Sequence, residues 1–228
     1  GPRSMRGLTT LTIVCSLSIG LFSTAAQARG KRGVKGLAMK HFSVGAREVS
    51  VIASTKSSGK GGAAIVRLQH TDVPVCQLLV LNAAPRKATS IVKAIRLRVC
   101  AAYGKEAKKA RLTEVQLTNG RRAYRTNVLS RRMDAIAKGV ETLRFWGIFA
   151  DMGTGFRAVF ERTSTSFKSQ KNKAVNQAEE CRPPAFPVGA TPTPLTIACT
   201  SGRMLGGAAT RKTSTVKYHW EAGRFLLN

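Results

Sequence analysis

Short runs of β-branched and apolar residues between positions 48 and 118 predict three strands. Residues 49–53 are a β-branched run, which is typical of a strand. Residues 75–81 are almost continuously apolar, as in a strand that is buried on both faces. Residues 112–117 alternate between apolar and polar positions, as in a half-exposed strand. The pattern therefore predicts a sheet in this part of the chain.

The pattern also predicts a helix over about residues 85–103, with Pro85 in its first turn and Gly104 as its C-cap. At 100° per residue, one arc of about 100° collects the apolar side chains. These are Ala88, Ile91, Val92, Ile95, Val99 and Ala102. The far side carries Arg86, Lys93 and Arg96, flanked by Lys87 and Arg98, and would suit phosphate groups. Residues 63–68 are a second, poorer helix candidate, because three glycines lie just before them.

Turn residues divide the second half of the chain. Asn119-Gly120 is a strong hairpin signal and would join residues 112–118 to 122–129. A second hairpin is expected between residues 143–149 and 156–163, with a helical turn over 135–141. Beyond Ser164 the chain is polar and rich in proline, which predicts extended structure with an edge strand at 215–220.

The net charge of the chain indicates what kind of partner it binds. The 228 residues hold 38 Lys and Arg against 11 Asp and Glu, a formal net charge of +27. Such an excess opposes a compact state unless a polyanion neutralises it, which favours nucleic acid over an anionic membrane surface. The first acidic residue is Glu48, so the chain is expected to divide into a basic leader (1–47), a nucleic-acid-binding domain (48–163) and an extended basic tail (164–228).

The leader itself permits three interpretations. Residues 8–28 carry no charge and end in the A-x-A pattern of Ala26-Gln27-Ala28, as a secretory signal peptide does. The surrounding basic and hydroxyl residues, without acids, are also typical of an organellar transit peptide, for a mitochondrion, which is favoured, or for a plastid. A membrane anchor is the third possibility, because Leu8–Ala28 is just long enough to span a bilayer.

Cysteine, histidine and acidic residues give little support for chemistry. The five cysteines form no CxxC pair, and Cys76 and Cys100 lie in apolar segments where buried thiols are expected. An odd cysteine count argues against a disulfide-rich secreted domain, and the three scattered histidines do not suggest a metal site. No nucleophile and base stand in a recognisable group, so no catalytic residue, metal, cofactor or small-molecule substrate is expected.

The order strand, Lys/Ser/Gly loop, helix, strand, basic helix, strand, strand resembles the Alba superfamily of nucleic-acid-binding proteins. The segments Val49-Ser50-Val51, Lys56-Ser57-Ser58 and Ala63-Ala64 look like its stage V sporulation protein S branch. The resemblance covers residues 48–118 well and extends loosely to about 163. It implies an α+β fold, a βαβαββ two-layer sandwich, to which the basic N- and C-terminal arms would be added.

The resemblance also implies a set of nucleic-acid contacts. Lys56 and Lys60 would be the loop lysines, Arg86, Lys87 and Lys93 the second-helix contacts, and Arg121, Arg122 and Arg125 would lie in a β-arm. From the residues themselves, Arg96 joins the basic helix face, and Tyr124 among arginines suggests stacking on unpaired RNA bases. The glycines of the 55–62 loop would let backbone N–H groups face a phosphate, although the loop lacks P-loop spacing.

Together these features predict a non-enzymatic RNA-binding protein of a large ribonucleoprotein. An organellar, mitochondrial ribosome is favoured, with ribosomal RNA and neighbouring proteins as partners. A free Alba-type DNA- or RNA-binding protein of a nucleoid or of mRNA regulation is the first alternative. A membrane-anchored or secreted interaction protein is the second, and it would touch a membrane only if Leu8–Ala28 were an uncleaved anchor.

Overall fold

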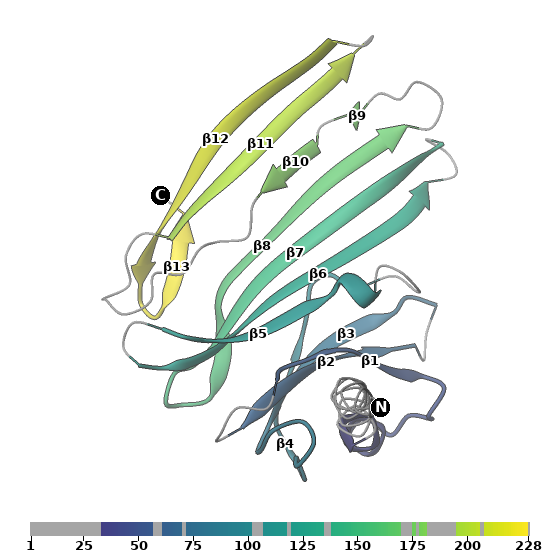
Figure 1. Ribbon diagram of the computed structural model, residues 1–228, viewed down its shortest axis with the longest axis vertical. Coiled ribbons are helices and arrows are strands. Elements are labelled where there is room, and N and C mark those ends of the chain that lie inside the picture. The colour runs from purple at the N-terminus through teal and green to yellow at the C-terminus, as the bar shows by residue number, and fades with distance from the viewer. Residues whose placement is uncertain are drawn as a thin grey trace, which may run out of the picture.

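The computed structural model shows a mostly β protein rather than the expected α+β fold (Figure 1). It describes residues 33–227 except 57–60, 70–71, 102–106, 118–119, 135–137, 170–174, 177, 182–194 and 206–207. Three antiparallel sheets contain all the described strands, and the helical structure among the described residues is confined to 33–42 and a short 3-10 turn, η1 (Ala107–Lys109). The Alba-like βαβαββ sandwich is therefore wrong for this chain.

The first sheet has the order β1-β2-β3-β4. Its strands are β1 (Val49–Ser54), β2 (Gly62–Leu68), β3 (Val75–Leu81) and β4 (Ile91–Arg96). The second has the order β5-β6-β7-β8-β9, with β5 (Arg111–Gln116), β6 (Arg122–Asp134), β7 (Gly139–Asp151), β8 (Phe156–Ser169) and β9 (Val175–Asn176). The third has the order β10-β11-β12-β13, with β10 (Ala178–Cys181), β11 (Leu195–Leu205), β12 (Ala208–Glu221) and β13 (Arg224–Leu227).

The second sheet is the middle layer of the protein, because it is buried on both faces. From β7, Phe145 and Phe149 pack with Ile65 and Leu78 of the first sheet. Trp146 and its neighbours on the other face of β7 join a cluster with residues of the third sheet, namely Ile197, Cys199 and Tyr218. Alternate residues of one strand thus enter different cores, which is the period of two that a strand imposes.

The first sheet is covered on its outer face by the helical residues 33–42. Val34 and Ala38 of this segment are fully buried and pack in a cluster with Ala64, Val66 and Leu79. The described part of the basic leader therefore belongs to the fold rather than to an extended arm. The same holds for the tail, whose described strands β10–β13 form the third sheet.

The helix predicted over residues 85–103 is wrong. The chain makes a turn at Pro85, where the N–H of Lys87 donates to the carbonyl of Ala84 at 2.8 Å, and then forms β4. A bulge opposite Val80 and Leu81 leaves Val92 without a partner in β3, and its side chain is 59% exposed. The β-branched residues that fit a helical arc also suit a strand, and tertiary pairing with β3 decides between the two.

The second predicted helix, over residues 63–68, is also wrong, because these residues belong to β2. Every residue of β2 is buried. A strand buried on both faces does not alternate between polar and apolar residues, so its sequence lacks the usual pattern of a strand. Gly62 is required by packing, since a Cβ there would lie 2.6 Å from Cδ of Pro85. Gly62 therefore serves a close approach of two segments, not a helix start.

The positions of the predicted strands and hairpins are confirmed. The three predicted strands correspond to β1, β3 and β5. Residues 215–220 lie in a strand, β12, but β12 pairs with β11 and β13, so the prediction of an edge strand there is wrong. β5 and β6 form the first hairpin, where Gly120 has a φ of 75°, and β7 and β8 form the second. The expected helical turn at 135–141 is wrong at its end, because residues 139–141 are part of β7, while 135–137 lie outside the described residues.

Two cysteines expected as buried thiols instead form a disulfide, Cys76–Cys100, which ties β3 to the loop that follows β4. Cys199 is also disulfide-bonded, and Cys181 lies opposite it in the β10–β11 ladder. The chain has five cysteines, and this odd count argued against a disulfide-rich secreted domain. Without Cys15, which lies in the leader, the count is even. Disulfides persist in oxidising compartments, so cysteine usage now favours one of these weakly.

Candidate nucleic-acid interface

The nucleic-acid contacts predicted on the first sheet lie on its surface but do not converge. Lys56 is exposed just after β1, while Lys60 lies outside the described residues. Arg86 and Lys87 are exposed in the turn before β4, and Lys93 is exposed on β4 itself. Arg96, at the end of β4, is the member of this set that reaches a concave surface.

The predicted β-arm is a structural part of the hairpin between β5 and β6. Tyr124 is fully buried, its ring stacks on Phe156 with centroids 5.6 Å apart, and its hydroxyl accepts a hydrogen bond from Arg122. Arg122 also pairs with Glu114 at 3.1 Å. Burial raises the pKa of Tyr124 to about 12, since the ionised form would lack solvation. A buried ring offers no face to a base, so Tyr124 does not belong to a stacking surface.

The other two arginines of the predicted arm are only partly exposed. Arg121 contacts the Sδ atom of Met152 at 3.6 Å through its guanidinium, and Arg125 is half-buried within β6. The segment from Arg121 to Arg125 therefore joins strands of the second sheet. It is not a mobile clamp for a duplex.

A cleft of about 660 Å³ lies at one end of the protein, between the first and second sheets. Its basic lining comes from three places: the end of β2, the end of β4 with the loop after it, and β6. The basic residues are Arg67, Arg96, Arg98, Arg131 and Arg132, and Asp72 is the one acidic residue in the lining. We call this set of five basic residues and their surroundings the arginine cleft.

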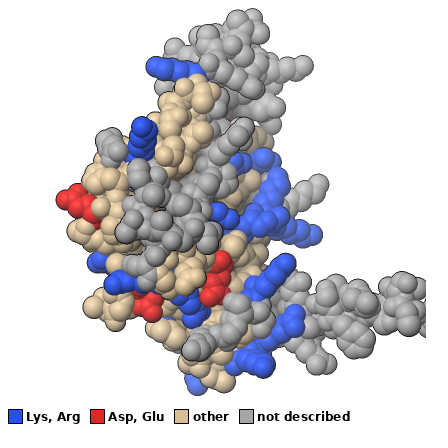
Figure 2. Space-filling view, turned by 60° about the vertical axis from the view of Figure 1, so that its left-hand side comes forward, with Lys and Arg blue, Asp and Glu red and all other residues tan. Residues whose placement is uncertain are grey.

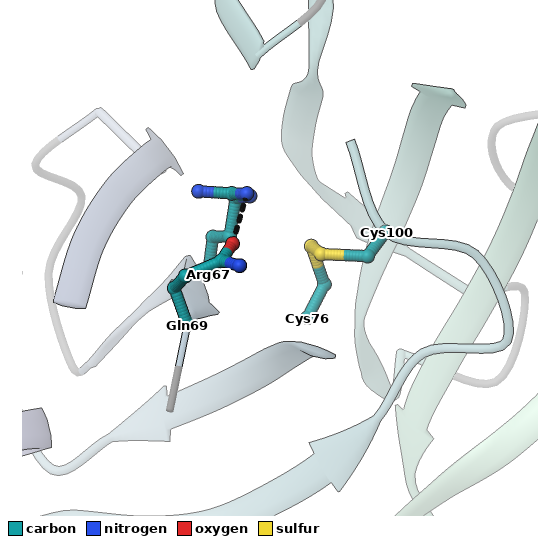
Figure 3. Close-up of a disulfide and its surroundings, with 4 residues drawn as sticks. All are labelled: Arg67, Gln69, Cys76 and Cys100. Atoms are coloured by element: carbon teal, nitrogen blue, oxygen red, sulfur yellow. Dashed lines mark hydrogen bonds between the residues drawn. A yellow bond between two sulfur atoms is a disulfide. The ribbon is translucent and has the colours of Figure 1, made fainter. Parts of the chain in front are cut away.

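Arg67 gives the arginine cleft a fixed positive charge. It lies on β2, a strand paired on both sides, opposite Ser50 of β1 and Cys76 of β3. Its side chain is only 3% exposed, and its guanidinium donates a hydrogen bond to Oε1 of Gln69 (Figure 3). A buried guanidinium loses hydration and retains its charge, so an anion within reach would be held more strongly than at the surface.

The remaining arginines are held at the mouth of the cleft. The backbone N–H of Leu97 donates to the carbonyl of Cys76 at 2.9 Å, and the disulfide fixes Cys100, so the segment with Arg96 and Arg98 is tied at two points. Arg98 pairs with Glu161 at 3.2 Å, but its side chain is 69% exposed, and such a pair is weak in water. Arg132 pairs with Glu141 in the same exposed manner.

Figure 2 shows the largest group of Lys and Arg toward the right of the view, with further basic side chains over the rest of the visible surface and few acidic ones. No aromatic residue lines the arginine cleft, so the described lining offers cations and hydrogen-bond donors but no stacking platform. Such a surface suits phosphate, sulfate or carboxylate groups, and contacts to phosphate carry no sequence information. Within the described residues, no three His, Cys, Asp or Glu side chains are grouped as a metal site would need.

Of the predicted contacts that the structure describes, only Arg96 lines the arginine cleft. Sequence reasoning placed Arg98 beside the basic face but missed Arg67, Arg131 and Arg132. Arg131-Arg132 is a visible dibasic signal, but its position depends on the long β6 strand. Arg67 stands in an apolar run and carries no signal of its own, because only the packing of the two sheets places it beside the others.

Comparison with known protein families, with curated proteins and with solved structures finds no match to this chain. Among the helical residues that the structure describes, none forms a span long and apolar enough to cross a bilayer. The candidate anchor Leu8–Ala28 lies outside the described residues.

Proposed function

We propose that this protein is a non-enzymatic nucleic-acid-binding protein that holds phosphate groups in the arginine cleft, without reading sequence. Five arginines from β2, β4, the loop after β4 and β6 line one cleft whose lining holds a single acidic residue, and this arrangement carries the proposal. Arg binds phosphate bidentately through its planar fork of donors, and each neutralised phosphate releases counterions. The net charge of +27 adds long-range attraction to any polyanion.

The shape of the site favours a single strand over a duplex. The cleft is a pocket of about 660 Å³ between two sheets, whereas a duplex presents a broad surface and needs an equally broad one. An RNA strand meets this requirement, as the sequence suggests, although contacts to phosphate alone do not distinguish RNA from DNA. The expected ribosomal role depended on an Alba-like domain that docks on ribosomal RNA. Because the chain does not have that fold, the proposal does not include a ribosome.

The disulfide supports one of the locations left open by the leader. A structural disulfide is typical of an oxidising compartment, so Cys76–Cys100 supports the secretory interpretation of residues 8–28 over a mitochondrial matrix address. The polyanion would then be met outside the reducing cytosol.

The test measures binding of the full chain to fluorescein-labelled single strands of RNA and DNA by anisotropy. The double variant Arg96→Gln/Arg131→Gln removes two cations of the cleft. The matched control, Arg86→Gln/Lys87→Gln, removes two exposed cations outside it. We expect the cleft variant to weaken binding at least tenfold and the control by less than twofold, with similar values for strands of different sequence.

Equal weakening by both variants would show that net charge alone causes the binding, and would overturn the proposal. A fivefold or greater preference for one base sequence would contradict recognition through phosphate alone. A sulfated polysaccharide that binds more tightly than RNA and DNA, and depends on the same arginines, would assign the cleft to a different polyanion.

A further inference from the structure

A second cleft, of about 700 Å³, lies on the other side of Arg67, between β1 and β5. Both strands are at the edge of their sheets: in the described ladders, β1 pairs with β2 and β5 with β6 (Figure 1). We call this cleft the edge groove. It is lined by Arg47, Glu48, residues 50–54, Arg67, Gln69, Ala107, Lys108 and residues 110–112.

The edge groove runs along the edge of β1 and not over one of its faces. Alternate side chains of a strand point to opposite faces, so a pocket on one face would be lined by every second residue. Here five consecutive residues, 50–54, line the groove, and residues 51–54 are all half-buried. Three consecutive residues of the β5 side, 110–112, line the opposite wall. The groove therefore gives access to backbone as well as to side chains.

The register shows which backbone groups of β1 face the groove. The N–H of Gln69 donates to the carbonyl of Glu48 at 2.8 Å, and the N–H of Thr55 to the carbonyl of Ala63 at 3.0 Å. Bonded and non-bonded pairs alternate in an antiparallel ladder. Counting from either end with the observed register, Val49, Val51 and Ser54 turn their N–H and C=O groups away from β2. Of these, Val51 and Ser54 line the groove, so their backbone groups are the ones that an additional strand would meet.

Charge selects the kind of strand that fits. Arg47, Lys108 and Arg111 are exposed around the groove, and Glu48 is the one acidic residue in its lining. The guanidinium of Arg111 donates to the carbonyls of Lys108 at 2.8 Å and Ala110 at 3.1 Å, which holds the charge at the rim. A second copy of β1 would bring like charges together, whereas an acidic segment would be attracted.

We propose that the edge groove binds an extended acidic peptide segment of a partner protein, added as a strand to the free edge of β1. Main-chain hydrogen bonds to Val51 and Ser54 would supply affinity, and the rim cations would select acidic side chains. The bulge at Ile52, which has no partner in β2, interrupts the regular edge. A bulged, positively charged edge resists pairing with its own kind. This inference does not depend on nucleic-acid binding by the arginine cleft.

The test uses the full chain and a fluorescein-labelled heptapeptide in which Glu or Asp alternates with Val. Two further peptides carry backbone N-methyl groups, one at odd and one at even positions, because an added strand bonds through only one of these sets. We expect one methylated peptide to lose at least tenfold in affinity and the other to lose less than threefold. Ser54→Pro removes one outward N–H from the edge and should weaken the unmodified peptide at least fivefold.

Ala94→Pro is the matched control, because it removes an N–H that faces away from β3 at the opposite edge of the same sheet, outside the edge groove, and it should leave peptide binding unchanged. Circular dichroism and RNA binding should be the same for both variants. Equal binding of both methylated peptides would show that charge attraction alone causes peptide binding, and would overturn the proposal. Failure of the unmodified peptide to bind would also overturn it, as would concentration-dependent dimerisation that Ser54→Pro abolishes.

Discussion

Removal of the Cys76–Cys100 disulfide should destabilise the protein strongly. The perturbation is the double substitution Cys76→Ala/Cys100→Ala, which keeps the buried Cys76 position apolar and leaves no unpaired thiol at either site. The bond joins residues 24 apart in the sequence, across β3, the following turn and β4. Its loss would free this loop in the unfolded state.

The magnitude follows from the entropy of closing that loop. For a separation of 24 residues, the chain-entropy relation gives about 3.4 kcal/mol at 25 °C. A typical domain is stable by about 5–15 kcal/mol, so the bond would supply a large share of the free energy of unfolding. Cys76 also packs in the core between the first and second sheets, so the smaller Ala side chains add a modest cavity cost.

Urea denaturation followed by tryptophan fluorescence measures the difference, with Trp146 buried in the core as a reporter. We expect the variant to lose about 3–4 kcal/mol in the free energy of unfolding, with the midpoint shifted to lower urea. A loss below about 1 kcal/mol would show that the bridge adds little constraint and would contradict the loop-entropy reasoning.

Two further predictions test the packing of the middle sheet. Because burial raises the pKa of Tyr124 from 10.0 to about 12, the unfolded state ionises first: stability is full below pH 10 and is lost as the pH rises toward 12. Wild type should therefore lose about 2–3 kcal/mol more than Tyr124→Phe between pH 10 and 12 in urea titrations, and parallel curves would contradict this. Gly147→Ala places a Cβ 2.6 Å from Phe149 Cε2 and 2.9 Å from Phe145 Cζ, so thermal denaturation should show a loss of about 1–3 kcal/mol. Gly36→Ala, a helical site with no atom within 4 Å of the new Cβ, should instead stabilise slightly, and equal losses at both sites would refute the packing argument.

Local signals in the sequence were sufficient for the strands that have one clear pattern. The β-branched run of β1, the apolar run of β3 and the alternation of β5 each determine their structure locally. The turn at Asn119-Gly120 fixes the first hairpin in the same way. These elements depend on neighbours in sequence, and a single chain displays such information directly.

The helices over residues 63–68 and 85–103 failed because their patterns were ambiguous. β2 is buried on both faces and shows no alternation, while the bulge at Val92 breaks the period of two in β4. An irregular strand with spaced apolar residues can match a helical arc by coincidence. Only pairing with β3 distinguishes the two structures, and that pairing is not local.

The candidate site was less predictable than the fold. The resemblance to the Alba superfamily rested on the order of strands and helices. Both segments that were predicted as helices in that order form strands in the structure. Arg67 comes from β2 and Arg131 from β6, and they line one cleft because two sheets end at the same place. A total charge shows that cations are abundant, but not which of them converge.

The salt dependence of single-stranded RNA binding tests the arginine cleft most directly. Each phosphate contact on a single strand contributes about 0.7 to the slope of log affinity against log salt concentration. Arg96→Gln/Arg131→Gln should therefore reduce the slope by about 1.4, while Arg86→Gln/Lys87→Gln should leave it unchanged. An equal reduction in both variants, or none in the first, would contradict the claim that the arginine cleft holds phosphate groups.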